Sequence, residues 1–241
     1  MNKQELVRFI NKYYLNGIVN SVVLNSKSDT QTLSTRFISG DKTLLGDVTI
    51  DKWDFENADV GIYNTEQLLK LLSVVDNDIQ LSFSKAGDKS IALKVSDSSS
   101  TINYMLSDTS IINEPPKMKA LPDFELSIDI TPQVINKFIN GKGALPETEN
   151  FTVITNGVDT KLVIGYASIN TNRVTIPVTT SKVSDIENVS FNANMFKEVL
   201  SANKECETAT LEVSSEGLSK ISFKVDNFTS TYWLVAGSDS N

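Results

Sequence analysis

Residues 55–82, FENADVGIYNTEQLLKLLSVVDNDIQLS, have the pattern of a strand, a helix and a second strand. Residues 59–63 form a short apolar segment that is typical of a strand. Thr65 then fits an N-cap position with Glu66 in the first turn, and leucines 68, 69, 71 and 72 make one apolar stripe. An alternating segment, 79–84, follows. The stretch therefore predicts a helix between two strands.

The same order of elements occurs four times along the chain. Expected helices begin at Lys3, Thr65, Thr131 and Asn192, at intervals of 62, 66 and 61 residues. Three expected strands follow each helix, at 18–24, 34–39 and 44–50, at 79–84, 90–95 and 101–106, at 151–155, 161–166 and 173–178, and at 209–214, 220–225 and 230–235. Leading strands at 59–63, 125–130 and 189–193 precede the last three helices, whereas the first repeat has none. A period near sixty residues indicates a repeated supersecondary unit.

A proline-rich segment separates the second repeat from the third. Pro115, Pro116 and Pro122 within residues 107–123 cannot continue a strand ladder. We therefore expect an N-terminal domain over 1–110, a linker over 111–123 and a C-terminal domain over 124–241. The predicted fold class is α+β, with four strand-helix-three-strand repeats forming two similar domains and helices on one face of antiparallel sheets.

The composition disfavours most enzyme classes. The chain has no histidine, and its single Cys206 permits neither an intrachain disulfide nor a cysteine metal cage. No nucleotide-binding or nucleophile-elbow motif occurs, so we expect no cofactor. The acidic residues of one region are scattered over turns without ligand spacing, which predicts no metal site: Asp29, Asp41, Asp47, Asp54 and Asp59. No apolar run approaches the roughly 20 residues of a membrane helix, so we expect a cytoplasmic protein that does not enter the membrane.

Positive charge is concentrated on the expected helices. These carry eight basic and five acidic residues, a net charge of +3, whereas the rest of the chain carries 14 basic and 25 acidic residues, a net charge of −11. The eight basic residues are Lys3, Arg8, Lys12, Lys70, Lys137, Lys142, Lys197 and Lys204. A single lysine on the solvent side of a helix usually serves solubility. Arg8, Lys70 and Lys197, however, share one position of the repeat, where the third copy has Asn136 beside Lys137, and this shared face predicts loose contact with phosphates.

Residues 55–82 resemble the strand-helix-strand segment of the DNA sliding clamps of T-even-type bacteriophages. By element order and length the resemblance extends over the whole chain, and it is most specific over 55–106. It implies a non-enzymatic homotrimeric ring that encircles double-stranded DNA without sequence specificity and tethers the replicative DNA polymerase. It also implies a clamp loader, and a possible role with transcription factors as a coactivator of late transcription. The alternative is a phage structural or scaffold protein that does not encircle DNA, and the shared basic position argues against it.

The resemblance further implies where subunits and partners bind. Subunits are expected to join through the last strands of the second and third repeats, with Ile102, Tyr104, Leu106, Val174, Ile176 and Val178 at the contact. Pro177 supports an edge position for the third-repeat strand, because proline interrupts a central ladder. Partner tails are expected in an apolar pocket near the linker and the C-terminal strand, lined by Ile111, Ile112, Met118, Leu121, Tyr232, Trp233 and Leu234. The linker residues among these serve either as a pocket lining or as anchors that hold the linker on the sheet.

Overall fold

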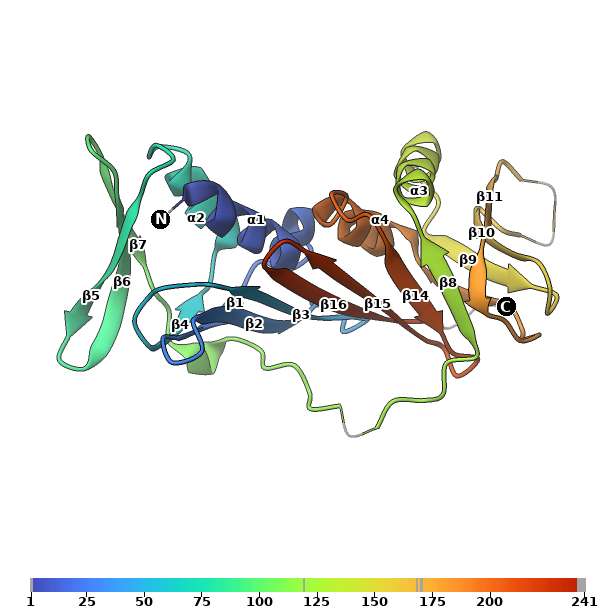
Figure 1. Ribbon diagram of the computed structural model, residues 1–241, viewed down its shortest axis with the longest axis horizontal. Helices are drawn as coiled ribbons and strands as arrows, with labels where there is room; N and C mark the ends of the chain where they lie inside the picture. Colours follow the sequence, from blue (N-terminus) through green and yellow to red (C-terminus); the bar gives the residue numbers. More distant parts are fainter. Residues whose placement is uncertain (1, 119, 168, 170, 238–241) are drawn as a thin grey trace. The chain divides into compact units, whose positions relative to one another are not determined.

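The computed structural model describes residues 2–118, 120–167, 169 and 171–237. The chain forms two compact units, the first made of Met1–Gly40 and Gly46–Pro115 and the second of Asp41–Leu45 and Pro116–Asn241. In each unit, two α-helices lie on one side of antiparallel strands (Figure 1). The division between Pro115 and Pro116 falls inside the segment that the sequence predicts as a linker.

Unit 1 contains two sheets. Its helices are α1 (Lys3–Tyr14) and α2 (Thr65–Leu72). One sheet has the order β3 (Leu44–Asp51), β2 (Thr32–Ile38), β1 (Val22–Lys27) and β4 (Ala58–Ile62), and the other has the order β5 (Gln80–Ala86), β6 (Lys89–Ser96) and β7 (Thr101–Met105). Short 3-10 turns at η1 (Leu15–Gly17) and η2 (Thr109–Ile111) complete the unit. The leading strand of the second repeat, β4, therefore pairs with the strands of the first repeat.

Unit 2 has the same exchange between repeats. Its helices are α3 (Pro132–Ala144) and α4 (Ala193–Ala202). One sheet has the order β12 (Thr180–Lys182), β8 (Leu126–Ile130), β14 (Ala209–Val213), β15 (Leu218–Val225) and β16 (Phe228–Val235). The other has the order β11 (Val174–Val178), β10 (Thr160–Ile164), β9 (Asn150–Thr155) and β13 (Val189–Asn192). Each repeat of unit 2 thus lends its leading strand to the sheet of the other, whereas in unit 1 only the second repeat does so, and these pairings join two repeats into one unit.

Side-chain caps fix where the helices begin. The side chains of Asn2, Asn64, Thr131 and Asn192 accept a hydrogen bond from a backbone N–H of the first turn, as N-cap residues do. The expectation that Thr65 is an N-cap is wrong by one residue. Asn64 holds that position, and the Thr65 hydroxyl instead donates a hydrogen bond to the carbonyl of Asn20 at 2.9 Å.

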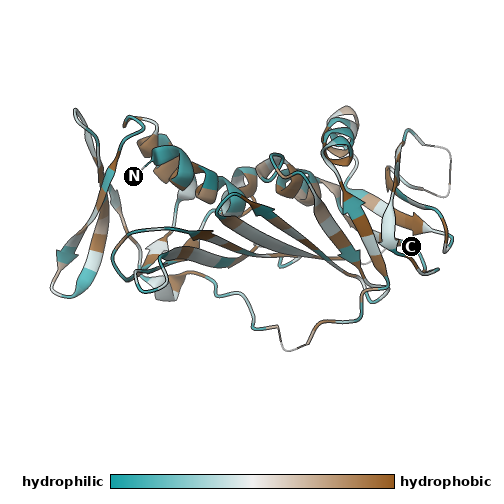
Figure 2. Cartoon of the chain, in the orientation of Figure 1, coloured by the Kyte–Doolittle hydropathy of each residue, from teal (hydrophilic) through white to brown (hydrophobic). Residues whose placement is uncertain are grey.

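Aromatic side chains fill the core beneath the helices. In unit 1, the ring of Tyr13 on α1 lies 6.4 Å from that of Phe37 on β2. A Cβ on Gly46 of β3 would come within 2.0 Å of the Phe37 ring, so that position requires glycine. In unit 2, Phe138 meets Phe196 edge to face with centroids 4.9 Å apart. Figure 2 shows apolar and polar residues mixed along the strands, as expected for sheets with one buried face.

Candidate nucleic-acid interface and partner surfaces

The helices present most of the predicted DNA-facing residues to solvent. Lys70 on α2 and Lys137 on α3 are exposed, and so is Lys204 just beyond α4. Three further basic side chains are partly exposed, Lys3 and Arg8 on α1 and Lys197 on α4. These six residues are called the basic set below. Their accessibility is what contact with a phosphate backbone would require.

Lys12 and Lys142 are not accessible, which corrects the sequence-based expectation for these two residues. Lys12 is 1% exposed and Lys142 is 7% exposed. Lys12 follows Phe9 by three residues, and Lys142 follows Phe138 by four, so each shares the buried side of its helix. The ammonium of Lys142 donates a hydrogen bond to the carbonyl of Pro146 at 2.7 Å. This contact places a cation at the C-terminal end of α3, where the helix dipole favours it.

Lys70 and Lys197 of the basic set form ion pairs with carboxylates. The Lys70 ammonium lies 2.5 Å from the Glu66 carboxylate one turn earlier on α2, and this hydrogen bond raises the pKa of Lys70. On α4 the Lys197 ammonium lies 2.6 Å from Glu198. Helix α3 has no acidic residue at all, so the field of Lys137 is not reduced from within its own helix. The positive field at the helices is therefore weaker than the number of basic residues indicates.

Uncharged amides share the exposed helix surfaces with these cations. Asn11 on α1, Gln133, Asn136 and Asn140 on α3, and Asn194 on α4 are exposed. Amide N–H groups donate hydrogen bonds to phosphate oxygens without releasing a counterion, whereas lysines contribute the salt-dependent part of affinity. A surface of sparse cations and amides has the chemistry for weak contact with a nucleic-acid backbone and lacks a cluster for base recognition.

The predicted subunit strands lie at sheet edges, β7 in unit 1 and β11 in unit 2. The N–H of Leu106 donates to the carbonyl of Ile91 at 3.0 Å. Because alternate residues of an antiparallel strand point their backbone groups to opposite sides, Tyr104 also faces β6, whereas Asn103 and Met105 point theirs away from it. Met105 is 67% exposed. The outer side of β7 is thus open to a further strand within the described residues.

Three side chains predicted at the subunit contact belong instead to the core of their own unit. Ile102, Tyr104 and Ile176 are buried. The Tyr104 hydroxyl donates to the carbonyl of Asn64 and accepts from its N–H, at 3.1 and 3.0 Å. The other three residues, Leu106, Val174 and Val178, are partly buried. The two strands are at sheet edges, as expected for a subunit contact, but Ile102, Tyr104 and Ile176 turn inward.

The predicted partner residues also divide into two groups. Ile111, Met118 and Leu121 are exposed, and Trp233 is partly exposed. Three others, Ile112, Tyr232 and Leu234, are buried within the chain, so their side chains offer little surface to a partner. A Cβ on Gly61 of β4 would lie 3.1 Å from Cδ1 of Ile112, so Ile112 anchors the start of the linker on β4. Tyr232 accepts a hydrogen bond from the Asn203 amide at 3.0 Å beneath the sheet.

The outer face of the sheet in unit 2 carries an apolar strip that sequence reasoning missed in part. Trp233 of β16 lies opposite Lys220 of β15, and the Lys220 ammonium lies 6.0 Å from the centre of the Phe124 ring. The next pair on the same face is Leu218 and Val235. Phe124, Leu218, Lys220, Trp233 and Val235 are called the outer strip below. Val235 could have been predicted from the sequence, because it follows Trp233 by two residues on the same strand and so lies on the same face.

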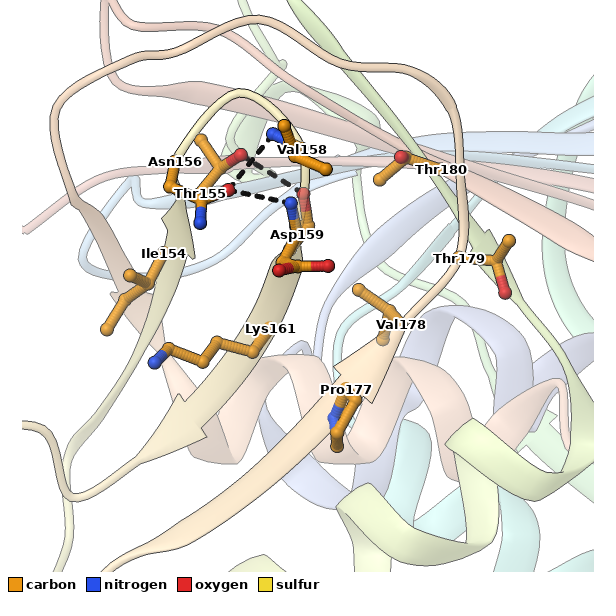
Figure 3. A pocket seen from close by; sticks show the side chains of 11 residues that line it. Ile154, Thr155, Asn156, Val158, Asp159, Lys161, Pro177, Val178, Thr179 and Thr180 are labelled. Atoms are coloured by element: carbon orange, nitrogen blue, oxygen red, sulfur yellow. Dashed lines mark hydrogen bonds between the residues drawn. The ribbon is translucent and has the colours of Figure 1, made fainter.

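A hollow of about 640 Å³ lies beside the β9–β10 hairpin of unit 2 (Figure 3). The Asn156 side chain accepts hydrogen bonds from the N–H groups of Val158 and Asp159 at 3.0 and 2.7 Å, which closes the hairpin turn. Lys161 and Pro177 lie on its walls. The lining contains no cysteine or histidine, and no group of three or more potential metal ligands occurs in the part of the chain that the structure describes.

No helix in the described residues is long and apolar enough to cross a membrane.

Comparison with known proteins extends along nearly the whole chain. The chain is 24% identical over 227 residues to the sliding clamp of Escherichia phage RB69, covering 92% of this chain and 91% of that protein. No protein-family model matches it. Its fold is similar to that of the proliferating cellular nuclear antigen (PCNA) of Entamoeba histolytica, with a TM-score of 0.75, 14% identity and coverage of 99% and 97%. The PCNA of Thermococcus kodakaraensis gives a TM-score of 0.73, 12% identity and 98% coverage of both chains. The chain therefore has the DNA-clamp fold, and over nearly its whole length its sequence is similar to that of a sliding clamp of the phage type.

Proposed function

We propose that this protein encircles duplex DNA as a ring and tethers a replicative DNA polymerase for processive synthesis. The observation that carries this function is the end-to-end likeness to the phage RB69 sliding clamp. The accessible basic set on the helices supports it, because it supplies positive charge in a chain of formal net charge −8. A ring is retained on DNA by topology, so its contacts need only be weak, and sparse cations with amides meet that requirement.

Three copies form the ring in this proposal. Each copy contributes unit 1, corresponding to the expected domain 1–110, and unit 2, corresponding to 124–241, with 111–123 as the linker. The open outer side of β7 in one copy pairs with the edge strand β11 of the next. Exposed edge strands are commonly covered by a partner, and backbone hydrogen bonds supply the contact without requiring the inward-facing side chains.

The tail of the polymerase binds the outer strip of unit 2 together with the exposed linker residue Leu121. Short tails with apolar side chains need a preformed apolar surface, and aromatic anchors such as Trp233 commonly carry much of the energy. A clamp loader uses the same surface to place the ring on DNA, and late-transcription factors are further candidate partners. The chain itself contributes no catalytic group in this scheme, and it acts in the cytoplasm where the phage genome is replicated.

The test compares retention on two DNA molecules after loading with a clamp loader and ATP. Labelled protein is loaded on nicked circular DNA and on linear DNA of the same sequence, and each complex is then separated by gel filtration. Topological linkage predicts that the protein stays on the circle and leaves the free ends of the linear molecule. Linearising the loaded circle with a restriction enzyme should then release it. Equal retention on both molecules would favour the alternative of a phage structural or scaffold protein.

A further inference from the structure

The leading strands of the two units differ in what covers their outer edge. In unit 2, β8 carries the short strand β12 along that edge, with Lys182 opposite Ser127. In unit 1, β4 is the last strand of its sheet. Among the described residues, the pairing on its outer side is one isolated bridge between Gly61 and Ser107. The remainder of the β4 edge therefore carries no strand.

Matching hydrogen bonds establish that the two edges correspond. In unit 1, the N–H of Ser107, just after β7, donates to the carbonyl of Gly61 at 3.0 Å. In unit 2, the carbonyl of Thr179, just after β11, accepts from the N–H of Asp129 at 2.9 Å. After Thr179 the chain continues along β8 as β12, whereas after Ser107 it turns into η2. The place that β12 fills in unit 2 is thus left open in unit 1.

The backbone of Asp59 points to this open side. Counting back two residues from Gly61 and from Asp129 aligns Asp59 of β4 with Ser127 of β8. Alternate residues of an antiparallel strand point their backbone groups to opposite sides, so Asp59 faces the same side as Gly61, away from β1. Its N–H and carbonyl have no hydrogen-bond partner on that side in the part of the chain that the structure describes.

A hollow of about 550 Å³ lies against this edge. Residues 57–61 form one wall, and the hairpin between β5 and β6, with Lys85 and Lys89, forms another. Asp59 also lines a second hollow, of about 400 Å³, together with Thr109. The uncovered edge therefore has space beside it for a short extended segment.

The lining of the two hollows has an excess of negative charge. Its two lysines, Lys85 and Lys89, are each paired with a carboxylate, at 2.5 and 2.8 Å. The Asp59 carboxylate accepts a hydrogen bond from the Asn25 amide at 2.7 Å, which leaves its charge in place. Three carboxylates of the lining form no ion pair within the described residues: Asp59, Asp88 and Glu114. The electrostatic environment of the edge thus favours a basic occupant.

We propose that the outer edge of β4 binds an extended basic segment of a partner protein, which adds to the sheet as a short antiparallel strand. The three-residue strand β12 gives the length and register, because it covers the same edge in unit 2. Lys182 lies there opposite Ser127, the position that Asp59 holds in unit 1. A lysine or arginine of the segment therefore lies opposite Asp59, and opposite charges that face each other across a strand pair stabilise it. This inference is independent of the proposed function, since β4 and β7 belong to different sheets.

The test uses a fluorescent peptide that copies residues 178–183, VTTSKV, with the full chain. Fluorescence anisotropy should show saturable binding. Asp59→Lys should weaken it at least about tenfold, because attraction to the peptide lysine becomes repulsion. Asp76→Lys is the matched control and should change binding little. Asp76 is exposed after α2, lines neither hollow, and its replacement alters the net charge by the same amount.

Peptide variants separate the specific contact from general electrostatics. A peptide with Lys182→Glu should bind the natural chain at least about tenfold more weakly, and the Asp59→Lys protein should restore its binding. A methyl group on the peptide nitrogen of Ser181 should abolish binding, whereas one at Thr180 should have little effect. The reason is that Thr179 directs its backbone to β8, so by alternation Ser181 does as well and Thr180 does not.

Three results would each overturn the proposal: absence of saturable binding, equal losses in folded Asp59→Lys and Asp76→Lys proteins, or failure of the exchanged charges to restore binding. A change in sedimentation of the protein alone on Asp59→Lys would assign the edge to a second copy and also overturn it. Retention of the Asp59→Lys protein on circular DNA is a separate measurement, so a failure here is distinguishable from a failure of the proposed function.

Discussion

The ammonium of Lys70 and the carboxylate of Glu66 lie 2.5 Å apart on α2, which offsets part of the positive charge of this helix surface. Glu66→Gln removes the carboxylate and leaves an amide of similar shape. We expect tighter binding of the protein to duplex DNA and a steeper dependence on salt, because Lys70 then faces the phosphates without an internal counter-charge. Filter binding over a series of salt concentrations measures both effects.

Asp88→Asn is the control for Glu66→Gln. Asp88 lies in the exposed turn between β5 and β6, away from the helices, and the substitution changes the net charge by the same amount. It should alter DNA affinity less than Glu66→Gln does. Equal gains from the two variants would mean that net charge alone controls binding and that the position of Glu66 has no special weight.

Charge reversal at Lys70, Lys137 and Lys204 should reduce loading and processive synthesis while the fold and assembly remain. All three are exposed, and the reduction follows from replacing attraction to phosphates by repulsion. The salt slope of DNA binding should fall by roughly one for each phosphate that a lysine no longer neutralises. The control reverses three exposed strand lysines, Lys27, Lys94 and Lys224, with the same net charge. Normal long synthesis by the first variant at physiological salt would show that the basic set serves only solubility.

The sequence predicts the elements far better than it predicts the site residues. Alternation and apolar stripes depend on local periodicity, so the helix-then-three-strands order holds in all four repeats. The three-residue strand β12 was missed because so short a segment has no period. Side-chain exposure depends on what packs across an element, which explains why Lys12 and Lys142 were misplaced on the solvent side. The apolar residues of the edge strands were assigned to the subunit interface because alternation alone does not show which face of a strand is buried. Tyr104, for example, points into its own unit.

Asn103→Pro should separate the proposed ring into single copies. The substitution removes an N–H that points to the outer side of β7 and leaves the ladder to β6 intact. Analytical ultracentrifugation measures the mass, and Asn103→Ala is the control that keeps the N–H. Proline at Tyr104 would be a poorer test, because that residue faces β6 and is bonded to Asn64. An unchanged trimer in the Asn103→Pro variant would place the subunit contact on another edge.

Trp233→Ala and Leu121→Asp should weaken binding of a polymerase C-terminal peptide by at least about tenfold each, while the protein stays folded. Both side chains are accessible, whereas Leu234 is buried and its replacement would destabilise the sheet instead. Isothermal titration calorimetry gives the affinity. Thr229→Asp is the control, because Thr229 is an exposed residue of the same strand outside the outer strip. Wild-type affinity in both variants would mean that the tail binds elsewhere.

Two buried tyrosines predict loss of stability at alkaline pH. Burial raises the pKa of Tyr13 in unit 1 and of Tyr232 in unit 2 well above the ordinary value of 10.0. Above about pH 10 the unfolded chain releases the two phenolic protons while the folded chain keeps them, so unfolding is favoured as pH rises. The free energy of unfolding should be nearly constant from about pH 7 to pH 9 and then fall, by roughly 1.4 kcal/mol for each pH unit and each tyrosine. Urea unfolding followed by circular dichroism measures this slope.

Tyr232→Phe should lower stability at neutral pH by about 1 kcal/mol, because the Asn203 amide loses one acceptor but keeps the Val199 carbonyl. The same variant should show a shallower decline above pH 10, and an unchanged slope would mean that groups other than this phenol control the alkaline transition.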